Sequence, residues 1–234
     1  MSKKKILTVA IALVLVAVIG VGTLAFFNDT KTVSNLFYTT TQPGPNPPGP
    51  NPPTPSSVFS IKLEETEFDE DGAATGNMTT TGNTYYKALP GSTFTKDPTV
   101  YNTGSLDQWV RVRVTITKTD AWAAAGIADP SVILNLNANW TINTSETVTD
   151  ASAKTVTYYI YYANKLEPGV RDTDGNYTTE PVGVTPFSTV TIPSSISDLD
   201  AFIALDGFNV NVVADAVQAD NNGSSATAAQ GWPT

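Results

Sequence analysis

The stretch WVRVRVTITKT, residues 109–119, shows the clearest period of two in the chain. Successive side chains of a β-strand point to opposite faces of the sheet, so a strand here separates two sets of residues. One set is Val110, Val112, Val114 and Ile116, and the other is Arg111, Arg113, Thr115 and Thr117. An apolar set that alternates with a polar set predicts an antiparallel sheet with one buried face.

The same alternation recurs at 59–64, 133–142, 155–162, 187–192 and 208–219. In ILNLNANWTI, residues 133–142, the pattern predicts one strand with a single apolar face, made of Leu134, Leu136, Ala138, Trp140 and Ile142. Several strands separated by turn-rich connections predict an all-β fold, an antiparallel β-sandwich or jelly roll. Two stretches, 120–127 and 197–205, are expected to form short helices that cap or cross the sandwich.

Composition excludes several classes of function. The chain has 234 residues, which suits one domain with appendages or two small domains, and a formal charge of −9. An acidic chain without a basic patch is not expected to bind nucleic acid. The chain contains no Cys and no His, which excludes disulfides, Ser-His-Asp or Cys-His catalysis and His-ligated zinc. We therefore predict no catalytic residues, no cofactor and no enzymatic activity.

The N-terminus is typical of an export signal. Lys3, Lys4 and Lys5 precede an apolar run from Ile6 to Gly22, and the small residues that follow offer a cleavage site. We predict a signal peptide over residues 1–25. Extended through Phe27, the apolar run is long enough to span about 30 Å of hydrocarbon, so a retained membrane anchor is the alternative.

A proline-rich segment divides the rest of the chain. Residues 43–55 read PGPNPPGPNPPTP, which prefers the extended polyproline II conformation and reaches roughly 40 Å. We interpret 43–57 as a linker, although a docking peptide for a proline-binding partner is an alternative. The linker separates an N-terminal arm, 26–42, from a β-sandwich domain, 58–234.

Two stretches carry a resemblance to a known family. GTLAFFNDTK, residues 22–31, and LPGSTFTKDPTVYNTGS, residues 89–105, resemble the leader junction and a turn-rich motif of the TasA/camelysin family of exported biofilm-matrix proteins. In the second stretch Lys96, Asp97 and Asn102 are among the residues that match, whereas Ser92 replaces the usual Asp. The proline-rich insert and the tail 221–234 depart from the family pattern.

The resemblance implies a place of cleavage, a fold and a mode of assembly. Cleavage by a SipW-type signal peptidase would fall between Ala25 and Phe26. The body would be a jelly roll, and the arm would be a strand donated to the next subunit. The apolar residues of this donor strand are Phe26, Phe27, Val33, Leu36 and Phe37. Camelysin-type members are described as metalloproteases, but the absence of His argues against that activity here.

Two acidic turns space carboxylates as calcium loops do. FDEDG places Asp69 and Asp71 before a glycine, and DTDGN does the same with Asp172 and Asp174. Neither continues with the other ligands of an EF-hand, so a plain Asp-Gly turn is the favoured interpretation and calcium the alternative. Aromatic side chains at 158, 159, 161 and 162 could stack on a carbohydrate, but we expect them to fill and rim the sandwich.

Two functions remain open after these observations. The favoured hypothesis is a secreted subunit of an extracellular fibre or biofilm matrix. It forms a homo-oligomeric filament head to tail through strand exchange, and it leaves the membrane after cleavage. The alternative is a surface adhesin held in the membrane by an uncleaved leader, with the proline segment as a stalk.

Overall fold

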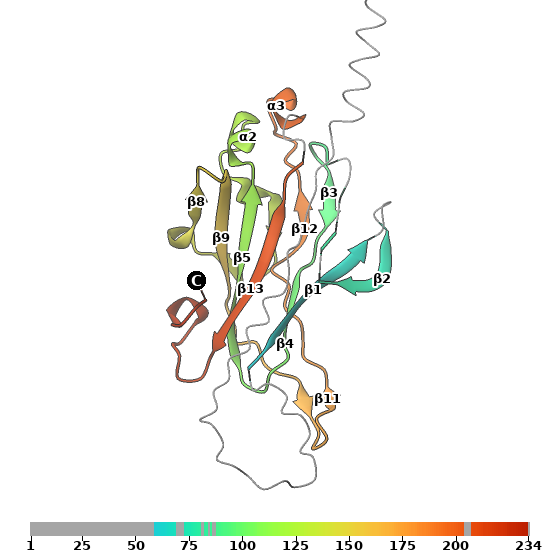
Figure 1. Cartoon of the computed structure of the whole chain (residues 1–234), viewed down its shortest axis with the longest axis vertical. Helices are drawn as coiled ribbons and strands as arrows, with labels where there is room; N and C mark the ends of the chain where they lie inside the picture. The colour runs from blue at the N-terminus through green and yellow to red at the C-terminus, as the bar shows by residue number, and fades with distance from the viewer. Residues whose placement is uncertain are drawn as a thin grey trace, which may run out of the picture.

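The computed structural model describes residues 59–68, 73–80, 82–83, 85, 88–203 and 207–233. Every strand pairing within these ranges is antiparallel, and the helices are short (Figure 1). The strands are β1 (Ile61–Phe68), β2 (Ala74–Thr79), β3 (Thr93–Thr95), β4 (Thr99–Asn102), β5 (Gln108–Thr117), β6 (Leu134–Leu136), β7 (Trp140–Ile142), β8 (Val148–Asp150), β9 (Thr155–Tyr162), β10 (Val170–Arg171), β11 (Tyr177–Thr179), β12 (Phe187–Thr191) and β13 (Val210–Gln218). The helical segments are α2 (Thr119–Ala124), α3 (Leu199–Ile203) and the 3-10 turns η1 (Pro130–Ile133), η2 (Thr144–Glu146) and η3 (Ala226–Ala228). The all-β prediction is confirmed, and the jelly-roll type stays a prediction.

Strand β5 is the centre of the largest sheet. It pairs with β13 on one side and with β9 on the other, and β7 and β8 both pair with β9. All four apolar residues that the sequence placed on one face of this strand are fully buried: Val110, Val112, Val114 and Ile116. The predicted alternation is therefore confirmed at the strand from which it was inferred.

Two smaller sheets supply the other side of the core. Their strand orders are β2-β1-β4 and β3-β12-β6. Leu63, Val100, Phe187 and Val190 from these strands belong to the same buried cluster as the inner face of β5. The core thus lies between sheets that face one another, as the alternating pattern requires.

The stretch 133–142 does not form one strand, and that prediction is wrong. Strand β6 pairs with β12, whereas β7 pairs with β9 in the other sheet. Between them Asn139 has a φ of 69°, a left-handed conformation that Asn tolerates better than most residues and that ends an extended chain. The chain therefore passes from one sheet to the other within an unbroken alternating pattern.

The two predicted helices are confirmed. Helix α2 begins one residue earlier and ends three residues earlier than expected, and α3 begins two residues later than expected. Both lie at the same end of the sheets (Figure 1). The fully buried Trp122 of α2 lies 5.8 Å from the ring of Phe202 in α3 and 4.7 Å from that of Phe208. These aromatic contacts fix the two helices to each other and to the start of β13.

The 89–105 motif forms a turn around Pro90 and holds a buried asparagine near its other end. Gly91 has a φ of 86°, and the Ser92 N–H donates to the carbonyl of Leu89 at 2.9 Å, which closes a turn around Pro90. Asn102 is fully buried. Its amide nitrogen donates to the carbonyl oxygens of Leu106 and Leu166, at 2.8 Å each, so this side chain ties two connections together.

Asp129 joins β9 to the turn η1, and this contact makes stability depend on pH. Burial raises the pKa of Asp129, but hydrogen bonds from Tyr158 Oη and from Ser131 outweigh that effect, so the pKa lies below its ordinary value. Because the pKa of Asp129 is lower in the folded state than in the unfolded state, its carboxylate stabilises the fold. This stabilisation is complete above the unfolded-state pKa of about 3.9 and is lost as the pH falls through the folded-state pKa.

We therefore expect the melting temperature to fall with acidification below about pH 4. Asp129→Asn should flatten that part of the profile, as measured by circular dichroism at several pH values. Glu180→Gln is the control for a general charge effect, because Glu180 is exposed and forms no ion pair within the described part of the chain. Equal acid sensitivity of the wild type and Asp129→Asn would contradict the assignment.

Candidate functional site

Strand β13 forms an edge of the largest sheet. All nine of its residues are in register with β5, from Val210 opposite Ile116 to Gln218 opposite Gln108. None of the other strands in the described ranges pairs with its opposite side. In Figure 1 it closes the row formed by β8, β9 and β5. Half of the backbone N–H and C=O groups of an edge strand point away from the sheet, and an added strand can bind them.

A cavity lies beside the end of this edge. Its volume is about 230 Å³, and its walls come from the start of β1, the connection before β5, the end of β13 and the C-terminal segment. The lining residues are Phe59, Leu106, Ala216, Val217, Gln218, Asn222, Gln230 and Gly231. Apolar side chains and backbone therefore dominate the cavity, which is the surface that a strand with alternating apolar side chains requires.

The C-terminal segment forms one wall of this cavity and is fastened to β5. The indole N–H of Trp109 donates to the carbonyl of Asn222 at 3.0 Å. The side chain of Asn222 then donates to the carbonyl of Gln230 at 3.0 Å and accepts from the backbone N–H of Gln230 at 2.9 Å. This pair of hydrogen bonds closes the segment into a loop against the outer face of the sheet.

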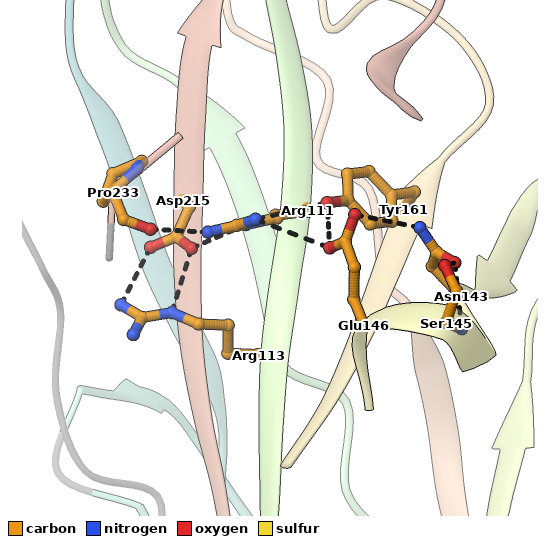
Figure 2. Close-up of polar contacts among 8 residues, drawn as sticks. All are labelled: Arg111, Arg113, Asn143, Ser145, Glu146, Tyr161, Asp215 and Pro233. Carbon is orange, nitrogen blue, oxygen red and sulfur yellow. Dashed lines mark hydrogen bonds and ion pairs between the residues drawn. The ribbon is translucent and has the colours of Figure 1, made fainter. Parts of the chain in front are cut away.

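Arg111 fastens the end of the same segment (Figure 2). Its Nη2 donates to the carbonyl of Pro233 at 2.6 Å, its Nε to the carboxylate of Asp215 at 2.9 Å and its Nη1 to Tyr161 Oη at 3.2 Å. The guanidinium also lies 4.8 Å from the ring of Trp232 and 4.8 Å from that of Tyr159. One side chain therefore joins three strands and the C-terminal segment.

Asp215 is the carboxylate at the centre of this network. It is fully buried and lies between two arginines, because Arg113 Nε approaches its Oδ2 to 2.9 Å and Arg113 Nη2 donates to Oδ1 at 3.1 Å. Tyr161 Oη donates in turn to Glu146 at 2.6 Å. Every charge in the network thus has a partner of opposite sign, which is the condition for burying charge.

The hydrogen bonds change the ionisation of two groups in the network. Burial lowers the pKa of Arg111, but the bonds to Tyr161 and Asp215 outweigh burial, and the pKa rises above its ordinary value. Burial and the hydrogen bond to Glu146 raise the pKa of Tyr161, against the effect of Arg111. The guanidinium stays charged and the phenol stays neutral at physiological pH. Arg111 and Tyr161 therefore act as fixed parts of a clamp at that pH.

Apolar packing completes the attachment of the C-terminal segment. A second buried cluster, apart from the main core, lies on the outer face of the large sheet. It consists of Trp109, Tyr161, Val217, Ala219, Ala226 and Ala229, with Tyr159 and Trp232 packed against it. The sequence predicted that only one face of β5 is buried. This expectation is wrong at Arg111, which is only 5% exposed because the C-terminal segment covers it.

The matching residues Lys96 and Asp97 both attach the chain after β3 to strand β1. Asp97 accepts hydrogen bonds from the backbone N–H of Thr66 at 3.0 Å and from its hydroxyl at 2.7 Å. Lys96 is almost fully buried and pairs with Glu65 at 2.8 Å. The resemblance gave these two residues as a motif, and the structure places them side by side in a fastening between strands.

Only one of the two acidic turns has both of its aspartates within the described residues. Asp69 and Asp71 lie outside the described residues. Asp172 closes the β10–β11 hairpin, since its Oδ1 accepts from the backbone N–H groups of Asp174 and Asn176 at 2.9 and 2.8 Å. Hydrogen bonding to the Asn176 backbone is the main reason why the pKa of Asp172 is lowered. The turn, which was the favoured interpretation, accounts for these contacts, and calcium stays the alternative.

The four tyrosines of β9 divide between the two faces of the sheet. Tyr158 belongs to the main core and Tyr161 to the outer cluster, and both are buried. Tyr159 lies beside Arg111, and Tyr162 packs against Trp140 with 5.1 Å between ring centroids. The expectation that these rings fill and rim the sandwich is confirmed, and they do not form one continuous stacking surface.

The cleavage residues Ala25 and Phe26 and the donor-strand residues Phe27, Val33, Leu36 and Phe37 lie outside the described residues. Among the residues that are described, none belongs to a helix long and apolar enough to cross a membrane. Groups of three or more Asp and Glu side chains placed to hold a metal ion are likewise absent from the described part of the chain. The unpaired position of β13 among the described strands and the apolar cavity beside it make this edge the candidate site.

Comparison with known proteins adds no relative: no family model, no curated protein and no solved structure matches the chain. The resemblance to the TasA/camelysin family thus stays a prediction from short motifs.

Proposed function

We propose that the protein is a secreted subunit of an extracellular fibre of the biofilm-matrix type. Its body is a jelly roll, and the arm 26–42 of each subunit adds a strand to the next. The observation that carries the proposal is the edge of β13, which is unpaired among the described strands and adjoins an apolar cavity. Strand addition of this kind derives affinity from backbone hydrogen bonds and specificity from alternate side chains.

The arm has the composition that such an edge accepts. Val33 and Phe37 lie four residues apart, so they fall on the same face of a strand. Beside β13 that face would turn toward the cavity lined by Phe59, Leu106 and Val217. The opposite face carries Ser34, Leu36 and Tyr38, of which the serine and the tyrosine tolerate partial exposure to water.

The position of the linker favours donation to a neighbour. Phe59, the first described residue after the linker, itself lines the cavity. An arm that filled its own cavity would have to reverse direction through 43–57, and a proline-rich chain in the extended polyproline II conformation resists a sharp reversal. Donation to another copy leaves the linker extended. Because head-to-tail contact of this kind does not close on itself, it produces a filament.

The test compares filament formation by the mature chain, 26–234, with that of three variants. Deletion of 26–42 should abolish filaments and leave a folded monomer. Val33→Asp with Phe37→Asp should also block assembly, because each carboxylate would be forced into an apolar cavity at a cost of several kcal/mol. Ser34→Asp with Thr40→Asp is the matched control, since it adds the same two charges on the opposite face and should assemble normally.

Light scattering and electron microscopy measure assembly, and circular dichroism confirms that each body is folded. Filaments of normal length and number after deletion of 26–42 would refute donation of the arm. If the exported protein also retained its first 25 residues by mass spectrometry, the membrane-anchored adhesin would replace the fibre subunit.

A further inference from the structure

A lysine, a glutamate and an asparagine meet in the interior beside β1. Lys96 is 1% exposed, Glu65 is 0% exposed and Asn83 is 5% exposed. Lys96 Nζ lies 2.8 Å from Glu65 Oε2. An ammonium has three donors, and this is the one hydrogen bond that Nζ makes among the described residues. Burying such a pair is unfavourable unless the geometry compensates, so its presence in the interior calls for an explanation.

The same carboxylate also holds the amide of Asn83. Asn83 Nδ2 donates to Glu65 Oε1 at 2.9 Å and to the carbonyl of Thr66 at 2.8 Å. Asn83 Oδ1 accepts from the backbone N–H of Phe68 at 2.8 Å. Glu65 therefore bridges an amine and an amide nitrogen, one on each of its oxygen atoms, while a backbone N–H polarises the amide carbonyl.

Aromatic side chains surround the three residues. The ring of Tyr85 lies 6.3 Å from that of Phe68 and 5.4 Å from that of Phe94. Tyr85 Oη donates to the carbonyl of Thr95, the residue before Lys96. The near-zero exposure of Lys96 and Glu65 shows that water is excluded from the pair. In an apolar setting the proton of a Lys–Glu pair can pass to the carboxylate, which leaves a neutral and nucleophilic amine.

We propose that Lys96 and Asn83 become joined by an intramolecular amide bond. Glu65 takes a proton from Nζ, and the neutral amine attacks Cγ of Asn83, so that an N–C bond forms and the carbonyl electrons move to Oδ1. The N–H of Phe68 donates to the resulting oxyanion. Glu65 then passes its proton to Nδ2 and accepts one of the two protons that remain on Nζ. The Cγ–Nδ2 bond breaks, and the departing ammonia takes this second proton from Glu65 and leaves as ammonium.

The products balance without any added reagent. An ammonium side chain and a primary amide become a secondary amide and an ammonium ion, and Glu65 returns to the carboxylate form. Nothing is oxidised or reduced. The bond joins the segment before Tyr85 to the end of β3, and it does not depend on the fibre proposal.

The mass of the purified chain tests the bond directly. The protein should be lighter than its sequence predicts by about 17 Da, the mass of the ammonia that leaves Asn83. Trypsin cleaves after free lysine and arginine, so it should leave Lys96 uncut and release the peptides 63–87 and 88–111 as one joined species. The exposed Lys62, which pairs with Glu64 at 2.6 Å, should be cut normally and serves as the internal control.

Glu65→Gln tests the role of the carboxylate, since glutamine can bind both nitrogen atoms but cannot carry the proton. This variant should show the full mass and separate peptides 63–87, 88–96 and 97–111, with its folding checked by circular dichroism. Lys62→Arg is the matched variant and should still lose ammonia. A folded wild-type protein with full mass and a free Lys96 would overturn the proposal, and the trio would then be a buried ion pair with a hydrogen-bonded amide.

Discussion

Asp215→Ala should lower the free energy of unfolding by about 3–5 kcal/mol, the range seen when one partner of a buried ion pair is removed. The variant leaves Arg111 buried beside Arg113 with no carboxylate between them. Arg111 would keep its bonds to the neutral acceptors Tyr161 and Pro233. Its Nη1 would also stay 3.8 Å from the carboxylate of Glu146, but that carboxylate is more distant and partly exposed, so it compensates the charge only weakly. The two arginines would also repel each other.

Urea denaturation followed by tryptophan fluorescence measures this loss. Asp220→Ala is the matched control, because Asp220 forms an ion pair with Lys165 at 3.1 Å that is more than one-third exposed on both sides. That variant should change stability by less than about 0.5 kcal/mol. A loss below about 1 kcal/mol for Asp215→Ala would show that water or movement of Arg113 replaces the carboxylate.

Removal of residues 221–234 should destabilise the body by several kcal/mol. The segment covers Trp109, Tyr161 and Val217, each less than 8% exposed, and re-exposure of a large apolar side chain costs roughly 1.5–3 kcal/mol. It also removes the Pro233 carbonyl from Arg111 and the Asn222 carbonyl from the indole of Trp109. The shortened protein should unfold at lower urea concentration and bind more of a hydrophobic dye.

The same truncation should impair assembly, because Asn222, Gln230 and Gly231 form one wall of the cavity beside β13. Ser224→Ala, at an exposed position of the segment, is the control and should leave both stability and filaments unchanged. Unaltered stability after truncation would contradict a packing role for the tail. If the truncated protein is destabilised but still forms normal filaments, the acceptor site lies elsewhere along β13.

The alternation in the sequence predicted strands well wherever a strand stays in one sheet. In β5 each of the four apolar residues is buried as expected. The pattern at 133–142 was equally regular, yet the chain leaves one sheet for the other at Asn139. A period of two reports which residues are apolar, and it does not report which sheet each half of the stretch joins.

The candidate site depends on side-chain contacts between strands that could not be predicted from the sequence. Arg111 and Arg113 were visible as the polar face of β5, and Asp215 as an acidic residue in another alternating strand. Their meeting follows from the register of β5 against β13, which places Arg111 opposite Asp215. Arg111 is buried because the C-terminal segment covers it. The sequence of that segment has no periodicity that would predict packing on the sheet.

In a fibre built by strand addition, tension would reach each body at two places: the edge of β13 and the start of β1. These places adjoin, because Phe59 lines the cavity at the end of β13. Load would therefore cross one rim of the body without passing through the sandwich. At that rim the carbonyl of Ser60 accepts hydrogen bonds from Thr103, Gly104 and Gln108, at 3.1 Å each. These bonds would share a pull on the chain, so mechanical failure should begin at this junction while the core of β5 stays folded.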